Sequence, residues 1–416
     1  MSRITKYALS DLYEMSSGIS STKEQAGHGA PFVSFSTVFN NYFLPDELSD
    51  LMDTNEKEQE IYSIKAGDVL ITRTSETIDE LAMSCVAVKD YPKATYSGFT
   101  KRLRPKKEGI AYPKYMAFYF RSELFRKAVT NNAFMTLRAS FNEDIFTFLD
   151  VYLPDYEEQV RIGDMLYAVE CKIQKNREIN DYLEEMAKTI YDYWFVQFDF
   201  PDENGNPYKS SGGKMDLIKD FGIAPSSWKI GNLYDIAEFI NGLACQKYRP
   251  TENEDSLPVI KIKEMHDGIS SDTEQVKSTI PENNIVRTGD ILFSWSASIE
   301  IQRWTGITGG LNQHIFKVIP KEKYSSSYVY HQLKSYVIKF IQMAETRKTT
   351  MGHITSDHLK QSVIILPPEN IIRNFSSQVD NIHAEICRIN KESQELSQLR
   401  DWLLPMLMNG QATIED

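Results

Sequence analysis

The sequence has no long apolar run, few cysteines and no excess of basic residues, and each shortage argues against a class of protein. No stretch of about 18 apolar residues occurs, so no segment is expected to span a membrane. The opening MSRITKYALSDLYEMSSG lacks the apolar core of a secretion signal, which predicts a cytoplasmic protein. The cysteines Cys85, Cys171, Cys245 and Cys387 form no CxxC pair, so we expect reduced thiols rather than disulfides or a zinc site.

Signatures of catalysis are also missing. YKSSGGKM contains a Gly-Lys pair, but Met215 stands where a phosphate-binding loop needs Ser or Thr. There is no GxSxG elbow, and the seven histidines include no HExxH pair. The sequence therefore predicts a binding protein with no catalytic residues and no metal.

The sequence does contain a repeat of itself. A Gly-Asp pair precedes an apolar run in both GDVLITR and GDILFSW, with Gly67 and Gly289 separated by 222 positions. Other pairs follow in the same order: Leu9 with Leu233 at a separation of 224, and Tyr115 with Tyr328, Ser122 with Ser335 and Leu153 with Leu366 at 213. An ordered series with a slowly drifting separation indicates an internal duplication.

Each copy begins with a mixed α/β domain. Strand-like runs occur at APFVSF, GDVLITR, LPVIKI, GDILFSW and QHIFKVI, and one helix is expected late in each copy, over 113–129 and 326–344. The predicted division is a first domain at 1–152, a long helix at 153–199, a linker at 200–225, a second domain at 226–366 and a second long helix at 367–416. The predicted fold class is therefore α+β, with two mixed α/β domains joined by two long helices.

After each Leu-Pro the apolar period changes to 3.5 residues, which is typical of a coiled coil. The apolar residues of the inward row are Ile162, Leu166, Val169, Ile173, Leu183, Ile190, Val379, Ile382, Ile386, Leu396 and Leu403. Arg400 is the one charged residue of that row, with Leu399 as the alternative at its position. Residues 162–194 form a rod of roughly 50 Å at 1.5 Å per residue.

We expect the two rods to pack antiparallel, with Trp194 opposite Phe375 and Leu183 opposite Ile386. The same register places Asn176 opposite Ser393. That pair is either a buried polar contact that specifies the register or a pair of water-facing residues where the seam opens. Likewise, the aromatic run over 191–195 is either a partner surface or a buried helix end.

The net charge of −12 argues against DNA binding only until it is divided by segment. The helices and the linker, 153–225 and 367–416, hold 12 basic and 23 acidic residues, whereas 61–141 holds 14 basic and 7 acidic ones. The candidate DNA contacts are Arg73, Thr74, Lys101, Arg102, Arg104, Lys106 and Arg138 in the first domain, and Trp295, Arg303, Asn312, Gln313, Arg347 and Lys348 in the second. For each of them a solvated surface role is the alternative.

Four features occur together: the duplicated mixed domain, the GDVLITR and GDILFSW strands, the helix entries LPDYEEQVRIGDML and LPPENIIRNFSSQV, and the linker phrase WFVQFDFPDENGNPYKSSGGKM. Over essentially the whole chain they resemble the specificity (S) subunit of type I restriction-modification enzymes. The second helix entry departs from the pattern, because Asn370-Ile371-Ile372 replaces the usual Glu-Gln neighbourhood.

The resemblance implies two target recognition domains that each read half of a split double-stranded DNA site, with the antiparallel coiled coil as a ruler. It also implies two methyltransferase (M) subunits and restriction (R) subunits as partners. S-adenosylmethionine and ATP with Mg²⁺ would be bound by those partners, and no cofactor by this chain. The rival interpretations are a coiled-coil scaffold unrelated to restriction and an enzyme with an unrecognised site.

Overall fold

The computed structural model describes residues 4–414 except 21, 76–79, 133–138, 220, 271, 297, 346–353 and 355. The chain divides into two compact units, Met1–Lys175 with Gln394–Asp416 and Asn176–Ser393. The finer division into five segments stays a prediction. Among the described residues no helix is long and apolar enough to cross a bilayer.

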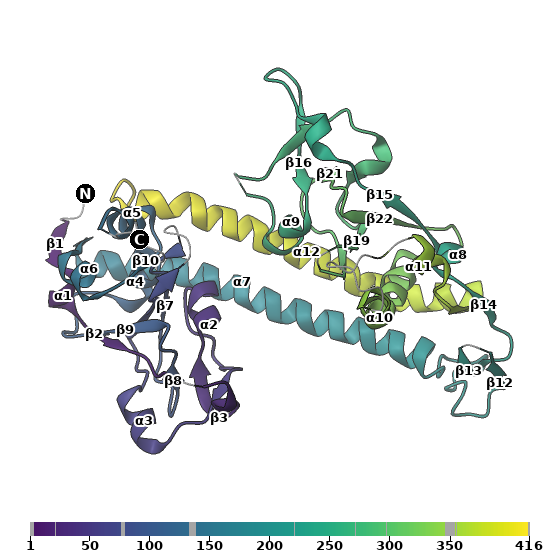
Figure 1. Cartoon of the computed structure of the whole chain (residues 1–416), viewed down its shortest axis with the longest axis horizontal. Helices are drawn as coiled ribbons and strands as arrows, with labels where there is room; N and C mark the ends of the chain where they lie inside the picture. The colour runs from purple at the N-terminus through teal and green to yellow at the C-terminus, as the bar shows by residue number, and fades with distance from the viewer. Residues whose placement is uncertain are drawn as a thin grey trace. The chain divides into compact units, whose positions relative to one another are not determined.

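The first unit is built on a four-stranded antiparallel sheet in the order β2-β9-β5-β7, of which Figure 1 labels β2, β9 and β7. Its strands are β2 (Tyr13–Ser17), β9 (Thr100–Pro105), β5 (Val69–Thr72) and β7 (Ser84–Val86). A second sheet contains β4 (Leu51–Met52), β3 (Ala26–Val33) and β8 (Thr95–Tyr96), of which β3 and β8 are parallel. Two short ladders pair β1 (Thr5–Ala8) with β11 (Asp150–Leu153), and β6 (Thr74–Ser75) with β10 (Ala139–Ser140).

The second unit repeats this plan, which confirms the internal duplication. Its main sheet has the order β15-β22-β19-β20, formed by β15 (Ala237–Asn241), β22 (Ile315–Pro320), β19 (Ile291–Ser294) and β20 (Glu300–Arg303). The second sheet contains β17 (Gln275–Lys277), β16 (Ser256–Ile260), β21 (Gly309–Leu311) and β18 (Ile285–Val286), and β16 and β21 are again parallel. The short ladders pair β14 (Lys229–Gly231) with β23 (Ile364–Leu366), and β12 (Met215–Ile218) with β13 (Gly222–Pro225).

Helices, most of them short, alternate with the strands in both units. In the first unit they are α1 (Leu9–Leu12), η1 (Lys23–Gln25), α2 (Phe35–Asn40), α3 (Glu56–Ile61), α4 (Pro113–Tyr119), α5 (Glu123–Asn132) and α6 (Glu143–Phe148). In the second they are α8 (Leu233–Ile236), η4 (Cys245–Tyr248), α9 (Ile262–Asp267), η5 (Glu282–Asn284), α10 (Ser326–Glu345) and α11 (Ser356–Lys360).

The single helix expected over 113–129 is wrong, because α4 and α5 are separate. Ser122 ends one and starts the other: its Oγ donates to the carbonyl of Tyr119 at 2.6 Å and accepts from the amide of Phe125 at 3.4 Å. Beside it, the Arg121 guanidinium donates to the carbonyl oxygens of Val38 and Ser84 at 2.9 and 2.7 Å. These tertiary contacts override a continuous helical pattern.

The two long helices are α7 (Tyr156–Tyr191), continued by a π-helical turn over Asp192–Val196, and α12 (Glu369–Met408). Within the second unit they run antiparallel, because Asn176 bonds to Ser393 at 3.1 Å while the Trp194 and Phe375 rings lie 5.9 Å apart. Both predicted pairs are confirmed, and Asn176 is a buried polar contact. The pairing of Leu183 with Ile386 stays a prediction.

The inward row of the helices packs with the core of each unit. Its buried members are Ile162, Leu166, Ile173, Val379 and Ile386, and its half-buried members are Val169, Leu183, Ile190, Ile382, Leu396 and Leu403. Tyr191, Trp194 and Phe195 are also buried, so the aromatic run over 191–195 is chiefly a buried helix end. Phe195 packs on Phe375 with ring centroids 5.0 Å apart.

Candidate nucleic-acid interface

A tight turn leads into the central strand β9 of the first unit, over residues 97–100. The amide of Thr100 donates to the carbonyl of Ser97 at 2.9 Å, and the amide of Phe99 donates to the Ser97 side chain at 3.2 Å. The turn over 312–315 in the second unit has the same bonds: the amide of Ile315 to the carbonyl of Asn312 at 3.1 Å, and that of His314 to the Asn312 side chain at 3.2 Å. The duplication has therefore preserved this turn in detail.

A glycine lies against the base of each turn. A Cβ at Gly18 would lie 2.2 Å from the carbonyl oxygen of Ser97, and a Cβ at Gly242 would lie 2.0 Å from that of Asn312. No side chain fits at such distances without backbone movement. The strands β2 and β15 can approach the turns only because these positions are glycine.

A second loop joins the tip of each turn. The amide of Arg73, directly after β5, donates to the carbonyl of Phe99 at 2.8 Å, and the amide of Trp295, directly after β19, donates to that of His314 at 3.2 Å. A third segment completes the group, because Phe141 donates to the carbonyl of Arg73 at 2.8 Å, and Ile354 to that of Trp295 at 3.2 Å. We call the group formed by residues 73, 97–101 and 141 the first platform, and its counterpart at 295, 312–316 and 354 the second platform.

The first platform presents two cations and an aromatic ring. Arg73 is exposed, and Phe99 is 65% exposed. Lys101 is half-buried and donates from Nζ to the Ser17 hydroxyl at 2.8 Å. Burial lowers the pKa of Lys101, and Arg73 lowers it further. The first platform thus combines cations suited to phosphates with one apolar ring, and Thr74 lies half-buried in the adjacent strand β6.

The second platform has different chemistry on the same backbone. The Trp295 ring lies 5.6 Å from that of the exposed His314, whose Nε2 is 3.2 Å from Nε2 of Gln313. Asn312 is buried, and its side-chain oxygen caps the turn. The surface of this platform is therefore aromatic and rich in hydrogen-bonding groups.

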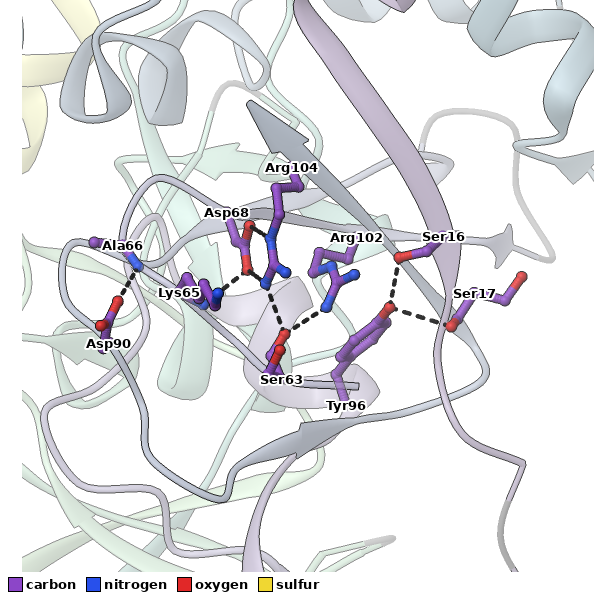
Figure 2. Close-up of polar contacts among 10 residues, drawn as sticks. All are labelled: Ser16, Ser17, Ser63, Lys65, Ala66, Asp68, Asp90, Tyr96, Arg102 and Arg104. Atoms are coloured by element: carbon purple, nitrogen blue, oxygen red, sulfur yellow. Dashed lines mark hydrogen bonds and ion pairs between the residues drawn. The ribbon is translucent and has the colours of Figure 1, made fainter. Parts of the chain in front are cut away.

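Two arginines of the basic run, Arg102 and Arg104 of β9, are directed toward Ser63 and Asp68 (Figure 2). Arg104 donates two hydrogen bonds to the buried Asp68 carboxylate, from Nε to Oδ1 at 2.8 Å and from Nη2 to Oδ2 at 2.6 Å. Both Arg104 and Arg102 donate to the carbonyl of Ser63, at 2.9 and 2.5 Å. Arg102 also lies over the Tyr96 ring, 5.5 Å from its centroid. These bonds tie the Gly67-Asp68 turn to the sheet.

The second unit uses one lysine for the same purpose. Lys317, which pairs with Leu292 in the ladder as Arg102 pairs with Leu70, donates to the carbonyl of Ile285 and forms an ion pair with Asp290, both at 2.8 Å. The Asp of each Gly-Asp pair also accepts from a backbone amide, Asp68 from Lys65 at 2.8 Å and Asp290 from Arg287 at 2.7 Å. The repeated Gly-Asp motif is therefore structural.

The remaining candidates lie apart from the platforms. Lys106 is exposed and donates to the carbonyl of Ser10 at 2.7 Å. Arg303 is directed toward α10 and α12, where it bonds Ser326 at 3.0 Å and lies 5.2 Å from the Tyr330 ring, and burial lowers its pKa. Arg138, Arg347 and Lys348 lie outside the described residues. DNA contact by all thirteen candidates stays a prediction, and the structure brings Arg73, Thr74 and Lys101 together, and likewise Trp295, Asn312 and Gln313.

Phe99 and His314 were missed in the sequence. The signal was present, because FTKRLRP and HIFKVIP align at a separation of 215 and place Phe99 opposite His314. Phe99 precedes the basic run KRLRPKK by two positions and carries no charge of its own. Among the described residues no group of three or more His, Cys, Asp and Glu side chains is arranged to hold a metal ion.

Known proteins share this organisation. The sequence matches the type I restriction modification DNA specificity domain over residues 1–185 and 225–396. It is similar to the type I restriction enzyme HindI specificity subunit of Haemophilus influenzae, with 23% identity over 437 aligned positions that cover 91% of this chain and 94% of that protein. The corresponding MjaIX subunit of Methanocaldococcus jannaschii is 21% identical, with 86% and 81% covered.

A solved structure shares the fold. The type I restriction-modification system S subunit from M. genitalium has a TM-score of 0.58 at 13% identity, with 98% of this chain and 96% of that chain covered. The family match spans both repeats and most of each long helix, so it agrees with the duplicated architecture. This chain belongs to the family of specificity subunits of type I restriction-modification systems.

Proposed function

We propose that this chain is the DNA-recognition subunit of a type I restriction-modification complex, and that each unit reads one half of a bipartite site. The observation that carries the proposal is the pair of platforms. In both units the same backbone bonds hold the tip of the turn, while the side chains differ between Arg73, Phe99 and Lys101 on one side and Trp295, Gln313 and His314 on the other. One scaffold with two chemistries suits two different half-sites.

The proposed roles follow from the side chains. Arg73 and Lys101 would contact phosphates and position the first unit. Gln313 carries an amide, the group that pairs with adenine in the major groove, and His314 can donate or accept a hydrogen bond. The inward cations Arg102 and Arg104 would act as positioning residues that hold the Gly-Asp turn.

We propose that the helix pair sets the distance between the half-sites. The polar contacts Asn176–Ser393 and Asn180–Asn390, at 3.1 and 2.8 Å, would fix its register, since a buried amide tolerates few partners. Deleting one matched heptad from both helices should shorten the preferred spacer and leave both half-sites unchanged. An unchanged spacer would contradict the proposal that the helix pair sets the distance between the half-sites.

The outer faces of the long helices suit methyltransferase subunits. On α7, Ile179, Tyr182 and Met186 are 42, 70 and 53% exposed at helical spacing, and on α12, Leu399 and Trp402 are 45 and 66% exposed. Met186 and Leu399 are equivalent in the repeat, 213 positions apart. The other positions differ, because Glu392 and Glu395 correspond to Ile179 and Tyr182, and Thr189 corresponds to Trp402. Each long helix would therefore offer its own apolar stripe to a methyltransferase subunit.

In this proposal the chain is not itself an enzyme. The methyltransferase subunits would bring S-adenosylmethionine, and restriction subunits would bring ATP and Mg²⁺, so this chain would bind no cofactor. The complex would act in the cytoplasm, where its DNA lies. A coiled-coil scaffold unrelated to restriction is not favoured, because it leaves the family match and the platforms unexplained.

The test is methylome sequencing of cells that express the chain with its methyltransferase. We expect one new bipartite methylated motif. Replacing residues 226–366 by the corresponding domain of another family member should change one half of the motif and preserve the other. Absence of any new motif, or a change in both halves, would contradict the proposal.

The docking stripes have their own test. Met186→Ala with Trp402→Ala should weaken co-purification of the methyltransferase. Phe148 is a matched control, because it is 76% exposed and lies on α6 rather than on either long helix. If Phe148→Ala weakens the association as much, the stripes are not the docking surface.

A further inference from the structure

The turn over residues 97–100 exposes the Phe99 ring to solvent. Its ring is 65% exposed although it is one of the large apolar side chains, most of which are buried in this chain. The turn fixes the backbone that carries the ring, because the Phe99 amide donates to Ser97 at 3.2 Å and the Phe99 carbonyl accepts from Arg73 at 2.8 Å. An exposed ring on a fixed backbone is well suited to binding, since little backbone freedom is lost on contact.

Two cations lie beside this ring. Arg73 accompanies it through the backbone bond, and Lys101 follows it by two residues in β9. Lys101 donates from Nζ to the Ser17 hydroxyl at 2.8 Å, beside the same turn, so both cations belong to the surface around this turn, where Arg73 lowers the pKa of Lys101 and Glu143 raises it. Phosphates on that surface would bring the ring to the edges of the bases.

The chemistry of the ring then limits what it can read. Phenylalanine carries no hydrogen-bond donor or acceptor. In the major groove the base edges present donors, acceptors and one apolar group, the 5-methyl of thymine. The thymine methyl is therefore the one feature of an unmodified major-groove edge that an apolar ring distinguishes by direct contact.

We propose that Phe99 is a specificity-determining residue that contacts the 5-methyl group of a thymine in the half-site read by the first unit. This inference rests on the proposed DNA-recognition function. The equivalent position of the second platform is occupied by His314, with Gln313 beside it at 3.2 Å. The second half-site is therefore read there through hydrogen bonds, without a thymine-methyl contact.

The experiment is a double-mutant cycle that combines substitutions of Phe99 with replacement of thymine by uracil in the DNA. The full chain in complex with its methyltransferase binds duplexes that carry the methylated motif, with each thymine of the first half-site replaced in turn by uracil. At one position uracil should weaken binding about fourfold, the factor expected for one buried methyl group. With Phe99→Ala the same replacement should have no effect, whereas Phe99→Leu should retain part of it.

His314→Ala provides the matched control, because it alters the same turn position in the other unit. It should leave the uracil effect in the first half-site at about fourfold. If no thymine couples to Phe99 although the motif is bound and methylated, the inference is wrong and the proposed function stands. If no bipartite motif is bound at all, the proposed function itself fails.

Discussion

Arg400 of α12 donates from Nη1 to the Glu170 carboxylate of α7 at 2.6 Å, inside the helix pair of the first unit. The two side chains are only 13 and 6% exposed. Leu399, the apolar alternative for this position, is 45% exposed and faces outward. A charged pair therefore occupies an inward position that an apolar residue one step away could have filled, so the alternative with Leu399 is wrong.

Arg400→Ala should strongly destabilise the first unit. It leaves the Glu170 carboxylate buried without its partner, which typically costs about 3 kcal/mol or more. The measurement is the free energy of unfolding from urea denaturation. Leu399→Ala is the control and should cost well under 1 kcal/mol, while the double variant Arg400→Met/Glu170→Met should recover most of the loss.

The second unit should lose stability in mild acid. His331 and His383 are buried with their Nε2 atoms 3.1 Å apart, and Arg303 donates from Nη2 to Nδ1 of His383 at 3.3 Å. Oγ of Ser327, which donates to the Asp380 carboxylate, lies 2.8 Å from the same Nδ1, and in the neutral pair one proton is shared between the two Nε2 atoms. Burial chiefly lowers the two pKa values, to about 2 for His331 and about 3 for His383, and Arg303 and Lys334 lower both further.

The sign of the effect follows from these directions. The unfolded histidines bind protons below about pH 6.5, whereas the folded ones remain neutral, so stability present at pH 7 is lost as the pH falls. Each histidine contributes up to about 1.4 kcal/mol per pH unit between pH 6 and 4. In urea denaturation across pH 7 to 5, His331→Gln/His383→Asn should give a flatter profile than the parent chain. If the free energy of unfolding of the double variant falls as steeply with pH as that of the parent chain, the histidine pair is not the cause of the acid sensitivity.

Gly18 and Gly242 should be separately required for the two half-sites. A Cβ at 2.2 Å from the carbonyl of Ser97, or at 2.0 Å from that of Asn312, must displace the turn that carries the platform. Gly18→Ala should therefore relax discrimination in the first half-site alone, and Gly242→Ala in the second. Methylation of duplexes substituted in one half at a time measures this. Gly109→Ala is a control for the substitution, because its Cβ would meet nothing within 4 Å, although its φ of 76° costs some local strain.

The polar contacts of the helix pair should specify register at the expense of stability. Asn176→Leu/Ser393→Leu should raise the free energy of unfolding by about 1 kcal/mol, because a buried polar layer gives way to an apolar one. It should also permit other registers. Cysteines introduced at Leu183 and Ile386 should crosslink efficiently in the parent chain and less selectively in the variant, with products identified by mass spectrometry.

Local patterns were enough to predict much of the fold. The heptad period and the constant separation of 213 placed Trp194 opposite Phe375 and Asn176 opposite Ser393, and both contacts are present. The strand at QHIFKVI and its counterparts followed from apolar runs between turn residues. These features depend on periodicity and repetition, which a sequence displays directly.

Features that depend on tertiary partners could not be predicted in this way. Arg104 belongs to the densest basic run, yet its direction is decided by Asp68, which is 36 positions earlier. The break after α4 depends on carbonyl groups that Arg121 meets in α2 and β7. Phe99 lacks charge, and its exposure depends on a turn closed by Ser97 and Arg73, which local patterns do not reveal.

The paired turns have a consequence for how such proteins acquire new targets. The bonds that close each turn come from the main chain and from residue 97 or 312, while the tip side chain at 99 or 314 is free of that task. In the proposed function, a single codon change at the tip would therefore alter what the unit reads at little cost to folding. Because the two tips belong to separate units, substitutions in one tip would change one half-site while the other half-site continues to bind the complex.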